Sequence, residues 1–169
     1  MLTVAGVIGN IIAAVLAGSG EFVAAGLVVL AASSLDMLDG ALARATGRAT
    51  NFGFVFDAVM DRVSEAAVLF GLLVYFSDRG DQTEELLIFV AVVASILVSY
   101  VRARAEMVGV EMREGLFSRA PRVALISAGL ILDAVWDESV TAMLWMLAVL
   151  ASMTVAQRLL LVWWKTRER

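Results

Sequence analysis

Two neighbouring segments are the most informative part of the sequence: Asp36-Met-Leu-Asp39-Gly40-Ala-Leu-Ala43-Arg44 and, after eight further residues, Gly53-Phe-Val-Phe-Asp57-Ala-Val-Met-Asp61. Together they bring four carboxylates into an apolar chain. Ionised carboxylates are expensive inside a bilayer and persist there when they are paired or bind a metal. Four aspartates at helical spacing, with small residues between them, therefore indicate a metal-dependent active site at a membrane surface.

The composition is that of an integral membrane protein. Of the 169 residues, 61% are hydrophobic, and the mean hydropathy is +0.87, whereas soluble domains are about half apolar. The chain has no Cys and no His, so a metal here must be a hard, oxygen-bound ion such as Mg²⁺, Mn²⁺ or Ca²⁺. No basic run with interleaved aromatic residues indicates nucleic-acid binding. We expect one membrane domain over residues 1–169.

The apolar runs predict an all-α bundle of six transmembrane helices, because about 20 apolar residues cross a bilayer. They lie at roughly 2–18, 22–46, 54–77, 85–107, 119–134 and 139–164. With alternating helix directions, every basic residue except Arg79 falls on one membrane side. By the positive-inside rule that side is cytoplasmic. We therefore expect a multi-pass protein of the cell (inner) membrane, with the aspartate segments and both termini in the cytoplasm.

The spacing of the four aspartates allows them to converge. Asp36 and Asp39 are three residues apart and share a helix face, while Asp57 and Asp61 are four apart, with Gly53 one turn earlier on their face. A short loop joins the two helices, so we expect them to be antiparallel neighbours. Bare anions brought together repel strongly at low dielectric, and one or two divalent cations relieve this.

Small residues lie beside the acids. Gly40 and Ala43 share the side of the first aspartate pair, and they let a phosphate or nucleotide approach the helix closely. The fork of Arg44 suits a phosphate. Two other interpretations remain open: a solvated charge patch at a helix end, and a proton or cation relay in a transporter. The interfacial position of the acids and the lack of paired broken helices argue against the relay.

The pattern D-x2-D-G-x2-A-R-x8-G-x3-D-x3-D resembles the signature of the CDP-alcohol phosphotransferases, and it is complete here. The resemblance implies a six-helix membrane enzyme, commonly a homodimer, with a cytoplasmic site. It implies that CMP is displaced from a CDP-linked lipid, such as CDP-diacylglycerol, by an alcohol hydroxyl. It also implies roles for individual residues: two divalent ions (Mg²⁺ or Mn²⁺) held by Asp36, Asp39, Asp57 and Asp61, the CDP moiety at Gly40, Ala43, Arg44 and Gly53, and Asp61 as general base.

The first apolar run departs from the family pattern. Members usually carry an amphipathic interfacial helix and a Pro-Asn pair before the first span, and only Leu2-Thr3 stands for that region here. We expect an upstream segment to be missing or the true start to differ.

A second region concerns the acceptor. The run Arg102-Ala-Arg104-Ala-Glu106, followed by Ser118-Arg119-Ala-Pro121-Arg122, is similar to the inositol-phosphate-binding stretch of bacterial family members that make phosphatidylinositol phosphate. Ser118 and Pro121 stand where those members have Glu. Arg119 and Arg122 share a helix face at a predicted helix start, and the N-terminus of a helix is a ready anion site.

We predict that Arg102, Arg104, Arg119 and Arg122 bind the phosphate of a phosphorylated polyol acceptor. Inositol phosphate is the first choice and glycerol 3-phosphate is the alternative. Two simpler interpretations stay open: a salt bridge between Arg102 and Glu106, and positive-inside anchoring by Arg119 and Arg122. A cation-coupled transporter is the non-enzyme alternative, and metal-dependent CMP release separates it from an enzyme.

Overall fold

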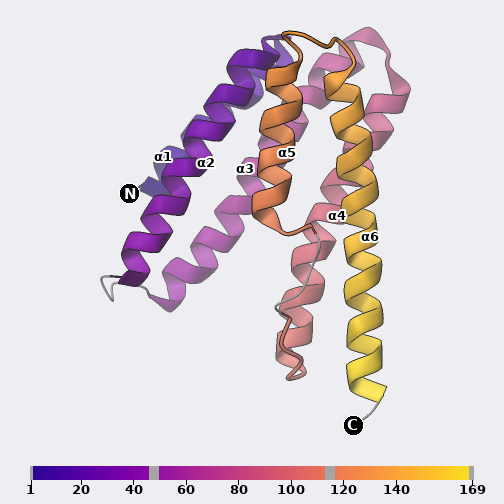
Figure 1. Ribbon diagram of the computed structural model, residues 1–169. Helices are drawn as coiled ribbons and strands as arrows, with labels where there is room; N and C mark the ends of the chain where they lie inside the picture. Colours follow the sequence, from indigo (N-terminus) through magenta and orange to yellow (C-terminus); the bar gives the residue numbers. More distant parts are fainter. Residues whose placement is uncertain (1, 46–49, 113–116, 168–169) are drawn as a thin grey trace.

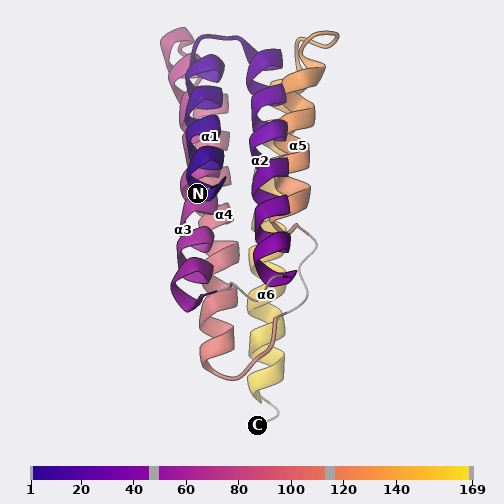
Figure 2. The same cartoon turned by 90° about the vertical axis from the view of Figure 1, so that its left-hand side faces the viewer.

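The computed structural model describes residues 2–45, 50–112 and 117–167, and side chains within 4–35, 50–112 and 117–167. These residues fold into helices and connecting turns, as predicted (Figure 1). The helices are α1 (Leu2–Gly18), α2 (Phe22–Ala45), α3 (Asn51–Arg79), α4 (Gln82–Met107), α5 (Arg119–Leu132) and α6 (Ser139–Arg167). They run up and down along one common direction (Figures 1 and 2).

The ends of α3 show how local chemistry sets the helix bounds. Thr50 is the N-cap, and its hydroxyl accepts a hydrogen bond of 3.0 Å from the backbone N–H of Gly53, which satisfies one of the free donors of the first turn. The helix ends at Gly80, whose φ of 74° is left-handed and suits glycine. The apolar pattern predicted that this helix begins near residue 54, whereas it begins at Asn51. The difference arises because the first turn after the Thr50 cap is not marked by the apolar pattern.

The six helices close into a ring. Helix α1 packs between α2 and α3, α2 packs on α5, α3 on α4, and α4 and α5 both pack on α6. Within the described residues, α2 and α3 run antiparallel but do not pack closely on each other. In this part of the chain the expected direct packing of α2 on α3 is not found, because α1 packs between them.

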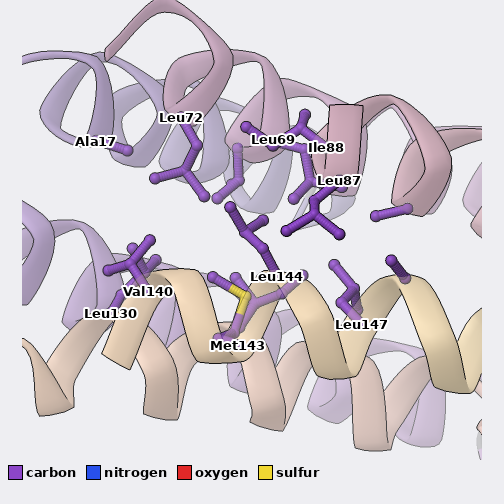
Figure 3. Packing of buried hydrophobic residues seen from close by; sticks show 14 of the residues in the cluster. Ala17, Leu69, Leu72, Leu87, Ile88, Leu130, Val140, Met143, Leu144 and Leu147 are labelled. Carbon is purple, nitrogen blue, oxygen red and sulfur yellow. The ribbon is translucent and has the colours of Figure 1, made fainter. Parts of the chain in front are cut away.

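The interior of the ring is apolar over most of its length. Leu144 of α6 is fully buried and lies centrally among core side chains of the other helices (Figure 3). Glycines permit two of the close crossings: a methyl group at Gly71 of α3 would collide with the carbonyl of Ala14 in α1, and one at Gly129 of α5 would collide with Met143 of α6. Small residues of this kind let membrane helices approach closely.

The outer surface carries many large apolar side chains. Phe70 is 63% exposed and Phe89 is 67% exposed, and large apolar side chains exposed in such number are typical of a surface that meets protein or lipid. Two helices of the described chain, α4 and α6, are long and apolar enough to cross a membrane, and Val4–Gly18 and Phe22–Leu35 are shorter apolar stretches. The charged residues of α3 and the 14-residue length of α5 explain why these two helices lack the same clear signal.

Candidate active site

One face of α3 carries the acidic groups. Asp57, Asp61 and Glu65 follow one another at intervals of four residues, so their side chains lie on one side of the helix with Gly53 one turn earlier. Burial increases along this series, from the half-buried Asp57 to the buried Glu65. A methyl group at Gly53 would meet only the Thr50 hydroxyl within 4 Å among the described atoms. At Gly53 itself the described part of the chain therefore leaves room for one additional methyl group, apart from the Thr50 hydroxyl.

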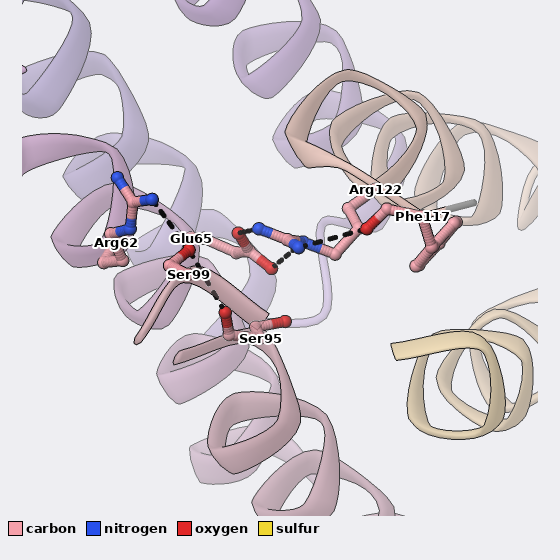
Figure 4. Close-up of polar contacts among 6 residues, drawn as sticks. All are labelled: Arg62, Glu65, Ser95, Ser99, Phe117 and Arg122. Atoms are coloured by element: carbon pink, nitrogen blue, oxygen red, sulfur yellow. Dashed lines mark hydrogen bonds and ion pairs between the residues drawn. The ribbon is translucent and has the colours of Figure 1, made fainter. Parts of the chain in front are cut away.

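Two arginines at the start of α5 meet this face. Arg119 Nη1 lies 2.7 Å from Asp61 Oδ1, with the two side chains 33% and 18% exposed. One turn deeper, Arg122 donates from Nε to Glu65 Oε1 at 2.9 Å and from Nη2 to Oε2 at 3.1 Å (Figure 4). The two arginines thus share a face, as the spacing predicted. Each of them contacts an acid of α3.

Arg122 is more enclosed than expected of a residue that binds substrate. Its side chain is 3% exposed, and Nη1 also donates to the carbonyl of Phe117 at 3.3 Å. The bidentate pairing with Glu65 is the strong form of an arginine–carboxylate contact. Arg122 therefore contributes its charge from inside the bundle.

Arg62 lies on a different side of α3. Its Nη2 donates to the hydroxyl of Ser99 in α4 at 2.7 Å (Figure 4), and its Nη1 donates to the carbonyl of Ala58. The Ser99 hydroxyl in turn approaches the carbonyl of Ser95 at 3.5 Å. This group joins α3 to α4 and leaves the acidic face to the residues of α5.

A narrow cleft, with free space on the order of one water molecule, opens beside Asp61 and Arg119. Its other polar walls are Asn10 of α1, Ser33 of α2 and Ser64 of α3, and its apolar floor is made by Val68, Val123 and Ile126. Four helices therefore contribute to one polar cleft, with α2 facing α3 across it. Asn10 and Ser33 were missed in the sequence, although a lone polar residue in an apolar span is itself a functional signal.

The first half of the aspartate signature lies on α2. The backbone of α2 is helical through Ala45, and Ser33, which lines the cleft, comes one turn before the position of residue 36. The side chains of Asp36, Asp39, Gly40, Ala43 and Arg44 lie outside the described residues. Their predicted roles stay predictions.

The groups that are described fit a hard divalent cation. Asp57 and Asp61 offer carboxylate oxygens one turn apart, and serine and asparagine oxygens line the adjoining cleft; such oxygen donors suit Mg²⁺ and Mn²⁺. Among the side chains described, three acidic groups do not gather at one point. A complete ligand set would thus have to draw on α2 as well.

The two arginines predicted on α4 diverge. Arg102 Nε contacts Glu106 Oε1 at 2.9 Å, with both side chains about half exposed, so the simple salt bridge considered from the sequence is present. Arg104 donates to the hydroxyl of Tyr100 at 3.0 Å and lies over its ring. Residues two apart on a helix point in different directions. This arrangement does not bring Arg102 and Arg104 to one ligand.

Arg158 of α6 is a candidate site residue that sequence reasoning did not select. It is 6% exposed, and its Nη1 donates to the carbonyl of Val98 at 2.6 Å. Its Nε has no hydrogen-bond partner within the described part of the chain, and it lies in the positive field of Arg102 and Arg122. A buried donor without a partner is costly, and three neighbouring cations repel. Both costs are relieved if an anion binds here.

This combination of an acidic helix face, a polar cleft and buried guanidinium groups can be compared with known proteins. Residues 1–163 match the CDP-alcohol phosphatidyltransferase family. The chain belongs to this family. It is therefore a phosphatidyltransferase of phospholipid synthesis, which confirms the resemblance of the aspartate segments and decides against a transporter. Use of a divalent metal is consistent with this family.

Several relatives named as inositol phosphate synthases match most of the chain. A phosphatidylinositol phosphate synthase of Mycobacteroides abscessus is 36% identical over 94% of this chain and 74% of its own length. An archaetidylinositol phosphate synthase of Methanothermobacter thermautotrophicus is 34% identical over 86% of this chain and 72% of its own.

Solved structures agree with these sequence relatives. A phosphatidylinositol phosphate synthase of Mycobacterium tuberculosis, crystallised with CDP-DAG bound, has a TM-score of 0.88 at 33% identity, covering 96% of this chain and 84% of that one. The same enzyme with manganese and citrate gives a TM-score of 0.85, covering 96% and 80% of the two chains. The described helices therefore share the architecture of a phosphatidylinositol phosphate synthase that has been crystallised with CDP-DAG bound.

Proposed function

We propose that the protein transfers the phosphatidyl group of CDP-diacylglycerol, or of a CDP-linked ether lipid, to inositol phosphate and releases CMP. The observation that carries the choice of a phosphorylated acceptor is the buried guanidinium of Arg158, which lacks a partner for Nε and lies near Arg102 and Arg122. Arg102 and Arg122 are paired with Glu106 and Glu65, whereas a neutral alcohol would leave the buried charge of Arg158 without a counter-charge. A phosphate accepts several charge-assisted hydrogen bonds.

Inositol phosphate is favoured over glycerol 3-phosphate by the relatives, whose names include both a bacterial and an archaeal inositol phosphate enzyme. Glycerol 3-phosphate carries the same phosphate and remains the second candidate. In this proposal Arg119 lines the acceptor side of the cleft, and the buried guanidinium groups of Arg122 and Arg158 add positive charge from inside the bundle. Arg102 adds positive potential, and Arg104 lies at the rim.

The donor side is assigned to the aspartate signature. We propose that Gly40, Ala43, Arg44 and Gly53 contact the CDP moiety, and that two divalent cations, Mg²⁺ or Mn²⁺, are held by Asp36, Asp39, Asp57 and Asp61. Bound there, the cations would supply charge neutralisation of the diphosphate and of the leaving CMP. The support from the described residues is the shared helix face of Gly53, Asp57 and Asp61 and the oxygen-lined cleft next to Asp61.

Asp61 is proposed as the general base. It lies in the cleft between the α3 face and Arg119, so an acceptor whose phosphate contacts the arginines would bring its hydroxyl close to this carboxylate. Asp61 takes the proton as the hydroxyl oxygen attacks the lipid-side phosphorus. The new P–O bond forms while the bond to the CMP oxygen breaks, and CMP leaves with that electron pair.

The placement in the membrane is part of the same proposal. All six helices would span the inner membrane, with the aspartate face and both termini in the cytoplasm. The support is the positive-inside bias: the described arginines of the cleft, and the basic last turns of α4 and α6, belong to one end of the ring, opposite Arg79. A homodimer is proposed from the resemblance to the family, and the exposed apolar faces leave room for it.

The proposal is tested by measuring CMP release from purified protein in detergent with CDP-diacylglycerol and Mg²⁺. The acceptors to be compared are inositol 3-phosphate, glycerol 3-phosphate, free inositol and serine. We expect the highest kcat/KM with inositol 3-phosphate. If glycerol 3-phosphate is preferred, the second candidate is correct. If free inositol or serine reacts as well as the phosphorylated acceptors, the assignment of the arginine cluster fails.

A further inference from the structure

The proposed function assigns no role to Glu65, although this buried carboxylate ends the acidic face of α3. Both Oε atoms accept hydrogen bonds from Arg122, and the two side chains are 7% and 3% exposed. Resting on the proposed function, we infer that Glu65 is a positioning residue of the acceptor site. It holds the Arg122 guanidinium inside the bundle, next to the cleft that Glu65 and Arg119 line, and through α5 it sets Arg119 against Asp61.

The packing of the ring explains why such a contact is needed. Helices α3 and α5 form facing walls of the cleft, yet within the described residues they do not pack closely on each other, since α3 is held by α1 and α4 and α5 by α2 and α6. The two ion pairs therefore bridge them at the polar end. The outer pair, Asp61–Arg119, is partly exposed, whereas Glu65–Arg122 is buried and bidentate.

The spacing along both helices couples the two pairs. Asp61 and Glu65 are one turn apart on α3, and Arg119 and Arg122 are one turn apart on α5. The Glu65–Arg122 pair thus limits how far α5 can slide or rotate relative to α3. It therefore also sets the distance between Asp61 and Arg119. A reaction that needs a hydroxyl and a base at contact distance is sensitive to displacements on the order of 1 Å.

Stability alone does not account for this pair. Two charges removed from water lose hydration, and a buried ion pair is on average no more stabilising than well-packed apolar side chains of the same volume. What a bidentate arginine fork adds is a fixed geometry. The carbonyl of Phe117, at 3.3 Å from Arg122 Nη1, holds the guanidinium plane from the other side.

The test is steady-state kinetics of Glu65→Gln with inositol 3-phosphate and CDP-diacylglycerol as the two varied substrates. Glutamine keeps the shape and one acceptor oxygen but removes the charge. We expect the acceptor KM to rise about tenfold or more, with the KM for CDP-diacylglycerol within about twofold of the wild type. Glu84→Gln is the matched control, because Glu84 also accepts a side-chain hydrogen bond, from Thr141 at 3.1 Å, but lies in the first turn of α4.

Other outcomes overturn the inference. A lower acceptor KM in Glu65→Gln would mean that Glu65 competes with the acceptor for Arg122. A lower unfolding temperature with both KM values unchanged would mean that the pair only stabilises the fold. If the glutamine variant does not fold, Glu65→Asp keeps the charge on a shorter arm, and an unchanged acceptor KM there also refutes the inference. Wild-type protein that does not use inositol 3-phosphate refutes the proposed function instead.

Discussion

Arg119 Nη1 lies 2.7 Å from Asp61 Oδ1, so the candidate phosphate-binding side chain and the candidate base share one ion pair across the cleft. A carboxylate that contacts an arginine is a poorer ligand for a cation, since the cation must compete with the guanidinium. The pair therefore links the donor side of the proposed reaction to its acceptor side.

The first prediction concerns metal affinity. Arg119→Ala should bind Mn²⁺ more tightly, because Asp61 loses a competing cation and the site loses a positive charge. The pair is partly exposed, so the effect should be modest, with the dissociation constant falling roughly two- to fivefold. Titration calorimetry without substrates measures it. Arg79→Ala, at the other end of the ring, should leave the affinity unchanged, and weaker binding in Arg119→Ala would contradict the competition.

A second prediction concerns metal removal. The chain has no His or Cys, so its cation must be held by oxygen atoms, which release divalent ions to a strong chelator. CMP release should vanish in excess EDTA and return when Mg²⁺ or Mn²⁺ is added back. Turnover that persists after extensive dialysis against EDTA would argue against a metal-dependent reaction.

A third prediction tests the base. Asp61→Asn should lower kcat by about 10²-fold or more, the usual scale for a lost general base, because the amide cannot accept the hydroxyl proton. Binding of CDP-diacylglycerol, followed by thermal shift, should largely survive. Asp78→Asn, near the opposite end of α3, serves as the control. A variant with near-normal turnover would remove Asp61 from this role.

Much of the fold followed from the apolar pattern. Residues 2–18, 22–46 and 85–107 were predicted as helices, and the observed helices differ from them by three residues at most. Glycines and charged turns interrupt the apolar runs clearly. The length of each apolar run therefore suffices to predict where a helix begins and ends. The contacts between helices were harder to predict. A short loop joins α2 and α3, yet α1 packs between them in the described part of the chain. The length of a loop does not show whether a third helix lies between the two that it joins.

The site was only partly predictable for the same reason. Asp57 and Asp61 are close in sequence, and their shared face follows from helical spacing. The partner of Arg122 is 57 residues away and that of Arg158 is 60 residues away, and no local pattern links such positions. The signal that could have found Glu65 and Arg158 is the cost of a charge inside an apolar span.

A fourth prediction concerns the crossing of α1 and α3. Gly71→Ala should lower the unfolding temperature in detergent, because the new methyl group collides with the backbone carbonyl of Ala14 and overpacking costs about 1–3 kcal/mol. Gly18→Ala is the matched control at the same crossing, since its methyl group would lie 3.4 Å from the Gly71 carbonyl, an ordinary contact. Equal stability of the two variants would show that α1 can shift without cost.

The final prediction concerns Arg158. Replacement by Gln keeps a donor for the carbonyl of Val98 but removes the buried charge and the unpartnered Nε. A group that serves only the fold should lose stability when it is replaced. Arg158→Gln should instead unfold at the same temperature or higher, since an uncompensated buried donor and the repulsion from Arg102 and Arg122 are relieved.

Binding of the acceptor should become weaker in Arg158→Gln, although the stability of the fold does not fall. If Arg158 binds its phosphate, the acceptor KM should rise about tenfold or more, because a hydrogen bond to a charged group contributes about 1.5–3 kcal/mol. Inositol 3-phosphate should raise the unfolding temperature of the wild type but not that of the variant. A destabilised variant with an unchanged acceptor KM would make Arg158 a structural residue, and the choice of a phosphorylated acceptor would lose its main support.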